Sequence, residues 1–590
     1  MPRPALTLAK TWRLTAPYFR SEDWRGGCGL LASVIAIELF LVGINVALNE
    51  WNNRFYNALQ NHNWHAFVTE LLFFCCLAAA YILLTVYQLY LNQWLQIGWR
   101  RWMTRSLLGN WLSAANHYRM QLLGDAADNP DQRIAEDINL FVERALSIGV
   151  GLLGSVVTLV SFVVILWGLS AQAPLQLFGT TLSIPGYLVW AALSYAAIGT
   201  FVTHFIGWRL IGLNFEQQRL EADFRFNLVR VRENAEQIAL LRGEAAERKR
   251  LLDRFGSVVV NWFAIMRRQK KLTFFTASYN QVSIVFPFVV VSPAYFAGAI
   301  QLGGLMQTAA AFNSVQGALS FFITIYRQLA EWQAVIERLN GFERAIAEAR
   351  AIASDPTAIQ VNASAGRSAI EIADLLVRLP NGVPLLEADC IILRAGDRVL
   401  VTGPSGSGKS TLFRAIAGVW PCGQGDIILP RGAHVMMLPQ RPYLPIASLM
   451  AAVAYPAEPE SFGAERLADV VMAVGLGTLV GRLEEEAHWN RILSLGEQQR
   501  LGLARAILHV PDYLFLDEAT ASLDEPAEAA LYRLLLQRLP ATTIISIGHR
   551  STLATFHRRR LSLVREGNRM QLRESGAREP IRHRDGEPAT

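Results

Sequence analysis

A glycine-rich run could hold the phosphates of a nucleotide. It reads Gly403-Pro404-Ser405-Gly406-Ser407-Gly408-Lys409-Ser410-Thr411 and fits the pattern G-x-x-x-x-G-K-[ST]. Glycines let backbone N–H groups curl around phosphates, Lys409 can reach the β- and γ-phosphates, and the Ser410 hydroxyl can bind Mg²⁺. The apolar run 398–402 predicts a strand before this loop, and a helix after it adds a favourable dipole. The pattern therefore predicts a site for a nucleotide and Mg²⁺.

Two carboxylates follow a second apolar run. The run Tyr513-Leu-Phe-Leu predicts a buried strand, and Asp517 and Glu518 come directly after it. A buried strand that ends at the phosphate edge of a parallel sheet can present one carboxylate to Mg²⁺. We assign that role to Asp517, and we expect Glu518 to polarise the attacking water. These residues predict hydrolysis of the bound nucleotide.

The elements that hold these motifs belong to only part of the chain. Of its 590 residues, 52% are hydrophobic and 18% are charged, against about 25% charged in an ordinary soluble protein. The shortage of charge is local, because long apolar runs fill the first 330 residues whereas 369–570 has an ordinary composition. Disorder, collagen and a small disulfide scaffold are excluded. An integral membrane part followed by a soluble part is expected.

Six mostly apolar runs reach the roughly 20 residues that are needed to cross a bilayer: 28–47, 68–90, 146–169, 185–208, 274–299 and 305–327. Residues 1–27 mix aromatic residues with arginine, which predicts an interfacial helix rather than a cleaved signal. The connections 98–145 and 209–273 are rich in arginine, so both termini should face the cytoplasm. The predicted domains are the elbow helix at 1–27, a membrane domain at 28–349, a linker at 350–368, a nucleotide domain at 369–570 and a polar tail at 571–590.

Some residues inside the expected spans need interpretation. Gly149, Gly151 and Gly154 spell GxGxxG, but without a preceding strand this favours close helix packing over dinucleotide binding. Glu38 is an ionisable group in mid-span and therefore a candidate proton or substrate group. Polar residues of the fifth and sixth spans either line a polar cavity or form hydrogen bonds between helices: Ser278, Asn280, Gln281, Ser283, Gln307, Asn313, Ser314, Gln316 and Thr324.

Four further motifs follow in an order that resembles the nucleotide-binding domain of ABC transporters. They are Leu493-Ser494-Leu495-Gly496-Glu497-Gln498-Gln499-Arg500 at the signature, Gln440 at the Q-loop, Ser522-Leu523-Asp524 at the D-loop and His549 at the switch histidine. The resemblance implies a six-helix membrane domain of the exporter type followed by an α/β P-loop domain that hydrolyses ATP.

The resemblance also implies roles for individual residues. Two copies would sandwich two ATP molecules, so that Ser494 and Gly496 of one chain cap the γ-phosphate held by Lys409 of the other. Glu518 would act as the base, and His549 would contact the γ-phosphate. Gln440 would lie at the Mg²⁺ ion beside Ser410 and Asp517, and Asp524 at the nucleotide.

Two departures from the family pattern stand out. Leu495 replaces a glycine in the signature, and Glu497 replaces a glutamine. The run 376–380 contains no aromatic residue to stack on adenine, which leaves Leu379 or a neighbour for that contact.

Within this family the chain resembles the YddA-like and SbmA/BacA-related bacterial transporters. The matching runs are Leu48–Gln60, after the first expected span, and Asn129–Asp137 in the first internal connection. The run Glu221–Glu236 is similar both to these and to the peroxisomal fatty-acyl half-transporters. The resemblance extends over nearly the whole chain.

These resemblances imply a homodimer in a bacterial inner membrane that moves peptides, cobalamin or similar hydrophilic compounds, with import favoured over export. A transporter of long-chain acyl groups or lipids is the alternative. A third hypothesis, motivated by Glu38, is a proton-coupled carrier with a regulatory ATPase domain. The net charge of +6 comes largely from the arginine-rich connections, so no nucleic-acid partner is expected.

Overall fold

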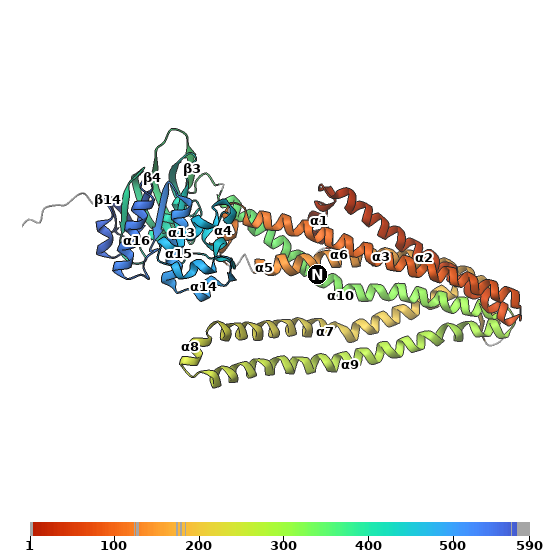
Figure 1. Cartoon of the computed structure of the whole chain (residues 1–590). Coiled ribbons are helices and arrows are strands. Elements are labelled where there is room, and N and C mark those ends of the chain that lie inside the picture. The colour runs from red at the N-terminus through yellow and green to blue at the C-terminus, as the bar shows by residue number, and fades with distance from the viewer. Residues whose placement is uncertain are drawn as a thin grey trace, which may run out of the picture. The chain divides into compact units, whose positions relative to one another are not determined.

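The computed structural model describes residues 4–122, 124, 129–172, 175–177, 180–182, 184–353, 355–567 and 569–574. The chain divides into two compact units. Figure 1 shows the whole chain, coloured by residue number from red at the N-terminus to blue at the C-terminus. The first unit comprises Met1–Leu108 and Asn129–Phe342, and the second comprises Gly109–Asp128 and Glu343–Thr590. The second unit is therefore built from two separate stretches of sequence.

Long helices make up most of the first unit (Figure 1). They are α2 (Trp24–Gln60), α3 (Trp64–Leu112, whose last turn belongs to the second unit), α6 (Ile138–Gln172), α7 (Tyr187–Glu233), α9 (Glu244–Phe296) and α10 (Leu302–Ala353). Shorter elements are α1 (Pro4–Thr15), η1 (Tyr18–Arg20), α5 (Pro130–Gln132), η4 (Arg133–Asp137), β1 (Leu175–Leu177), β2 (Thr180–Leu182) and α8 (Ala235–Leu240).

Among the described residues, five helical segments are long and apolar enough to cross a membrane. They cover the first five expected spans except for residues 185–186 and 297–299. The sixth expected span lies in α10, which does not meet the same criterion over its described residues. The side chain of Thr324, one of the expected polar residues, lies outside the described part of the chain.

Aromatic packing attaches the N-terminal elbow to the helices that follow. Tyr18 is buried, and its ring stacks on that of Trp99 with centroids 5.6 Å apart. A Cβ atom at Gly27 would come within 2.9 Å of the same ring. The elbow and the start of α2 can therefore approach this closely only because residue 27 is glycine.

Asparagine and glutamine side chains of α2 hold the start of α10. Asn57 Oδ1 accepts a hydrogen bond from Gly303 N–H at 2.8 Å, and Gln60 Oε1 accepts one from Leu302 N–H at 2.7 Å. A Cβ atom at Gly303 would lie 2.0 Å from the Asn53 carbonyl oxygen. The first amides of a helix have no partner within the helix. Side chains of the run Leu48–Gln60 therefore satisfy these amides and position the start of α10.

The Glu38 side chain reaches from α2 to two other helices. Gln88 of α3 donates a short hydrogen bond to its carboxylate. On α6, a Cβ atom at Gly154 would lie 1.9 Å from Glu38 Oε1. Gly154 therefore allows close packing, as its small size predicts. The group that packs against it is the Glu38 carboxylate. The carboxylate sits among three helices of the expected membrane region.

Enlarging Gly154 should therefore destabilise the first unit. We expect Gly154→Ala to cost about 1–3 kcal/mol, the usual range for overpacking, because Glu38 must give up its place beside Gln88. Thermal unfolding of the purified protein in detergent measures the effect. The matched control is Gly149→Ala, where an added Cβ meets nothing within 4 Å. Equal losses from both changes would contradict this packing, and Glu38→Ala should remove most of the Gly154→Ala effect.

The polar residues of the fifth and sixth expected spans divide into two groups. Ser283 of α9 is buried and bonded to Gln316 of α10, which is hydrogen bonding between helices. Ser278, Asn280 and Gln281 are instead exposed on the surface of the single chain. Asn313 is exposed too, but its Oδ1 also accepts a hydrogen bond from Ser283 at 3.5 Å. Interhelical bonding therefore describes some of these residues and exposure describes others, and Asn313 shows both.

Ten strands form one sheet in the described part of the second unit. Its order is β3 (Gln360–Ser364), β7 (Gly423–Pro430), β4 (Ala369–Arg378), β5 (Pro384–Arg394), β14 (Arg569–Glu574), β13 (Arg559–Glu566), β6 (Arg398–Thr402), β12 (Thr543–Ile547), β11 (Tyr513–Asp517) and β8 (Val435–Leu438). Strands β13, β6, β12, β11 and β8 are parallel neighbours.

Apolar cores cover both faces of this sheet, as successive side chains of a strand point to opposite faces. On β11, Leu514 and Leu516 join a core with α12 (Leu449–Ala454), α13 (Ala464–Ala473), α15 (Leu495–His509) and α16 (Glu525–Arg538). Tyr513 and Phe515 join the other core, with α11 (Lys409–Ile416) and strands β4 and β5. A strand buried on both faces is the expected form of a parallel strand.

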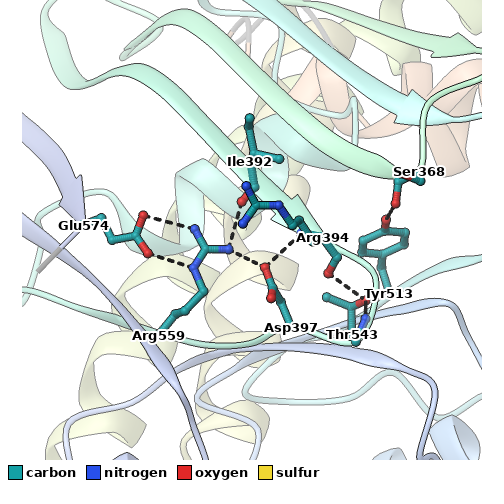
Figure 2. Close-up of polar contacts among 9 residues, drawn as sticks. Ser368, Ile392, Arg394, Asp397, Tyr513, Thr543, Arg559 and Glu574 are labelled. Carbon is teal, nitrogen blue, oxygen red and sulfur yellow. Dashed lines mark hydrogen bonds and ion pairs between the residues drawn. The ribbon is translucent and has the colours of Figure 1, made fainter. Parts of the chain in front are cut away.

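A polar cluster fixes the starts of several strands (Figure 2). Arg559 Nε, at the start of β13, donates to Glu574 at 2.8 Å, and its guanidinium also contacts Asp397, just before β6. Asp397 accepts the Arg394 N–H at 2.9 Å, and Thr543, at the start of β12, contacts the Arg394 carbonyl. Because these strands are parallel, fixing their starts aligns their other ends, where the sequence motifs lie.

A short segment from the first internal connection belongs to the second unit. It contains η2 (Ser113–Ala115) and α4 (Asn116–Leu122). Arg119 Nη2 donates to the Gly418 carbonyl at 2.9 Å, and Leu122 packs against the core shared by α11 and β4. Burial lowers the pKa of the Arg119 guanidinium. The connection 98–145 is thus attached to the sheet domain through this segment.

Element boundaries differ in places from the expected domain limits. Helix α10 continues to Ala353, and strand β3, inside the expected linker 350–368, pairs with β7. Strand β14 continues to Glu574, four residues into the expected tail, and 575–590 lies outside the described residues. The sheet therefore includes residues that lie before and after the expected nucleotide domain 369–570.

Candidate functional site: a nucleotide site at the sheet edge

The predicted motifs follow parallel strands of one sheet. Strand β6 leads into the glycine-rich loop, β11 into Asp517 and Glu518, β12 into His549 and β8 into Gln440. The order β6-β12-β11-β8 makes these strands direct neighbours. Because the carboxyl ends of parallel strands meet at one edge, all four motifs lie at the same edge of the sheet.

The glycine-rich loop is curled around the Lys409 side chain. Its Nζ donates to the carbonyl oxygens of Gly403 at 2.9 Å and Pro404 at 2.8 Å. Gly408 has a φ of 91°, and a Cβ atom there would also lie 3.0 Å from Leu385. Only glycine suits this position. Burial lowers the pKa of Lys409, and the nearby carboxylates of Glu518 and Asp517 oppose that effect.

Ser410 and Asp517 form the pair expected at a magnesium ion. The Ser410 hydroxyl donates to Asp517 Oδ1 at 2.9 Å. Burial raises the pKa of the Asp517 carboxyl, while the bond from Ser410 acts in the opposite direction. A hydroxyl and a carboxylate are the hard oxygen donors that Mg²⁺ prefers, so the residues present fit this ion. A nearby cation would also stabilise the ionised form of Asp517.

Glu518 and His549 face one another across the edge. The distance from His549 Nε2 to Glu518 Oε1 is 3.3 Å, and both side chains are partly exposed. Glu518 has a φ of 50°, a conformation that non-glycine residues seldom adopt, and its N–H donates to the Ile547 carbonyl at 3.2 Å. Strained backbone of this kind occurs at functional sites. It turns the Glu518 side chain out of the strand direction at this position.

The signature residues begin helix α15. Ser494 is the N-cap, and Glu497 forms a capping box with it: Ser494 Oγ accepts from Glu497 N–H, and Glu497 Oε2 accepts from Ser494 N–H at 2.9 Å. The Ser494 hydroxyl also donates a hydrogen bond to the same Glu497 Oε2 at 2.8 Å. Glutamate or glutamine at the third helical residue is the usual partner in this motif. The replacement of glutamine by Glu497 therefore keeps the cap of α15 intact.

Several predicted site residues are not brought to the loop by this single chain. Among the described residues, no hydrogen bond joins Ser494 or Gly496 to the glycine-rich loop. Asp524 caps α16 by accepting from Ala527 N–H at 3.2 Å. Gln440 contributes its carbonyl oxygen to a hydrogen bond from Gln499, and its side chain is exposed. The roles expected for these four residues at the nucleotide stay predictions.

Other residues shape the site but are missing from the sequence predictions. Leu385 limits residue 408 to glycine, as described above. Gln499, inside the signature run, and Arg550, the residue after the expected switch histidine, both contact the D-loop. At the expected adenine position, Leu379 N–H donates to the Val383 carbonyl at 2.8 Å in a turn. Sequence motifs mark the loops themselves, and these side chains are recognisable only from how the loops pack.

A phosphate-binding loop with a hydrolytic carboxylate, joined to several membrane-length helices, defines a membrane transporter driven by a nucleotide. Two family models match, the ABC transporter transmembrane region 2 over residues 14–296 and the ABC transporter domain over 390–521. The chain belongs to the ABC transporter family and is an ATP-hydrolysing transporter with one membrane part and one nucleotide-binding part.

Relatives of this chain match it over most of their length. An uncharacterised ABC transporter ATP-binding protein of Haemophilus influenzae is 38% identical over 90% of this chain and 88% of its own. The inner membrane ABC transporter ATP-binding protein YddA of Escherichia coli is 36% identical, over 92% and 95%. The mouse lysosomal cobalamin transporter ABCD4 is 28% identical, over 86% of each. The predicted relation to YddA-like proteins is confirmed.

The solved structure of a bacterial Atm1-family ABC exporter with ATP bound has the same fold. Its TM-score is 0.66 at 16% identity, with 92% of this chain and 94% of that one covered. The predicted fold class, a helical membrane domain of the exporter type followed by an α/β P-loop domain, is confirmed.

Proposed function

We propose that two copies of this chain form a transporter for peptides, cobalamin or similar hydrophilic compounds in a bacterial inner membrane. The observation that carries the substrate class is the exposed polar set on α9 and α10, Ser278, Asn280, Gln281 and Asn313. Polar side chains within a membrane-spanning region are costly in lipid and usually face a water-filled path. The cobalamin transporter among the relatives and the resemblance to SbmA/BacA-related proteins support the same substrate class.

Exposed apolar residues on α7, α8 and α9 support the homodimer. Outside the expected spans, Phe226 and Leu252 are exposed, and Leu240 and Leu241 at the end of α8 are 77% and 83% exposed. Large apolar side chains that gather on a surface mark a protein contact. We propose that a second copy of the chain covers it. With arginine-rich connections on this side, both termini would lie in the cytoplasm.

In the proposed hydrolysis, Lys409 and the loop amides bind the phosphates of ATP. Ser410 and Asp517 would hold Mg²⁺, with Gln440 close by, and the ion would neutralise charge on the β- and γ-phosphates. Glu518 takes a proton from water as the water oxygen attacks the γ-phosphorus and the bond to the β-phosphate oxygen breaks. His549, held next to Glu518, contacts the γ-phosphate.

The second copy would complete the site. Ser494 and Gly496 would bring the start of α15, with its free N–H groups, to the γ-phosphate of the other chain. Asp524 would lie at the same interface. Closing and opening of this sandwich would move the long helices, because the segment 109–122 is attached to the sheet domain. Import is the direction we favour.

The test uses sealed vesicles of uniform orientation with the nucleotide domain outside. Loaded with labelled cobalamin or a bleomycin-like glycopeptide, they should lose the label on addition of ATP if the protein imports. Vesicles with Glu518→Gln should retain it. Movement of neither compound, together with ATP-dependent movement of a labelled long-chain acyl compound, would establish the lipid alternative instead.

A further inference from the structure

The Gln499 side chain joins two loops of the nucleotide site. It is 2% exposed, and both ends of its amide are used. Nε2 donates to the Gln440 carbonyl at 2.9 Å, and Oε1 accepts the Ser522 N–H at 3.0 Å. One buried side chain of α15 thus fixes the Q-loop backbone relative to the D-loop backbone. Neither bond can be lost cheaply, because a buried polar group without a partner is costly.

Arg550 holds the other side of the D-loop. Its guanidinium donates to the carbonyl oxygens of Leu523 at 2.6 Å and Ala521 at 3.1 Å. The same guanidinium lies 3.6 Å from the carboxylate of Glu528, which is buried and also accepts a bond from Thr520. The backbone of residues 521–523 is therefore hydrogen-bonded both by Gln499 and by Arg550.

Arg550 directly follows His549, which lies 3.3 Å from Glu518. A continuous series of contacts consequently runs from the Q-loop through Gln499, the D-loop and Arg550 to the pair Glu518–His549. We propose that Gln499 and Arg550 are positioning residues that transmit the position of the Q-loop to this hydrolytic pair. The proposal rests on the roles given above to Glu518 and His549, but not on the identity of the transported compound.

Gln499→Leu tests the proposal, because leucine fills a similar volume but makes neither hydrogen bond. We expect kcat for ATP hydrolysis by the purified full-length protein to fall about tenfold, the scale of one or two lost hydrogen bonds. KM for ATP should stay within about twofold, because no phosphate contact is removed. Rates are divided by the ATP binding stoichiometry, so that misfolded protein does not lower kcat.

Gln537→Leu is the matched control. It makes the same change of residue at an exposed position of α16, outside the nucleotide site. It should leave kcat within about twofold. A similar loss in both variants would mean that the change acts through general damage to the domain and would overturn the proposal.

A double-mutant cycle with Arg550→Lys separates coupling from stability. Lysine keeps the charge beside Glu528 but cannot reproduce the forked contact with two carbonyls. If both residues act through the D-loop, the two losses in kcat should be less than multiplicative, since either change already breaks the series. Multiplicative losses, or a change in KM alone, would refute the transmission. Abolished hydrolysis in Glu518→Gln with an unchanged rate in Gln499→Leu would refute this inference and leave the proposed function intact.

Discussion

Glu518→Gln should reduce ATP hydrolysis by about 10²–10⁴-fold, the range contributed by a general base, and leave ATP binding unchanged. The amide keeps the shape of the side chain and its place beside His549, but it cannot accept a proton from water. Release of phosphate by the purified protein measures the rate, and binding of a fluorescent ATP analogue measures the affinity.

Glu460→Gln provides the matched control, because Glu460 is an exposed residue outside the site and should keep the full rate. Transport must stop together with hydrolysis if ATP drives the cycle. Cargo movement that survived Glu518→Gln but failed with Glu38→Gln would establish proton coupling. The contacts of Glu38 with Gln88 and Gly154 give it a packing role, so the second variant needs a folding check by size-exclusion chromatography.

Lys409→Ala should remove ATP binding itself. The loss of a buried, hydrogen-bonded cation opposite the phosphates is expected to weaken affinity by about 100-fold or more. The carbonyls of Gly403 and Pro404 would also lose the donor around which the loop is curled. Equilibrium binding of the same ATP analogue measures the change.

The two variants therefore separate binding from chemistry. Lys409→Ala should lose both affinity and hydrolysis, whereas Glu518→Gln should lose only hydrolysis. Arg533→Ala, which removes an exposed cation of α16, controls for the loss of positive charge. Unchanged affinity in Lys409→Ala would show that the glycine-rich loop does not bind phosphates as proposed.

The parts of the site that are contiguous in sequence were predictable. The loop that ends in Lys409 and the carboxylates that follow β11 each form one short motif, and each motif fixes its own chemistry. The contact between Gln499 and Gln440 was not predictable, because it depends on α15 packing beside β8. Motif spacing along a chain does not determine which helix packs on which strand.

The fold shows the same division between strong and weak local signals. Long apolar runs predicted the long helices of the first unit well. Strand β3 was missed inside the expected linker, because Gln360, Asn362 and Ser364 do not show the apolar pattern of a buried strand. Glu497 was noted only as a departure, although Ser494 and Glu497 have the spacing of a capping box.

The bond between Arg119 and Gly418 has a consequence for the timing of biosynthesis. The two residues are 299 positions apart, and a ribosome that adds roughly 5–20 residues per second needs about 15–60 s to cover that distance. During this interval α4 has been made but its binding surface has not. The early segment must wait until the last third of the chain is synthesised, so an mRNA truncated before that point yields helices whose attachment site does not exist.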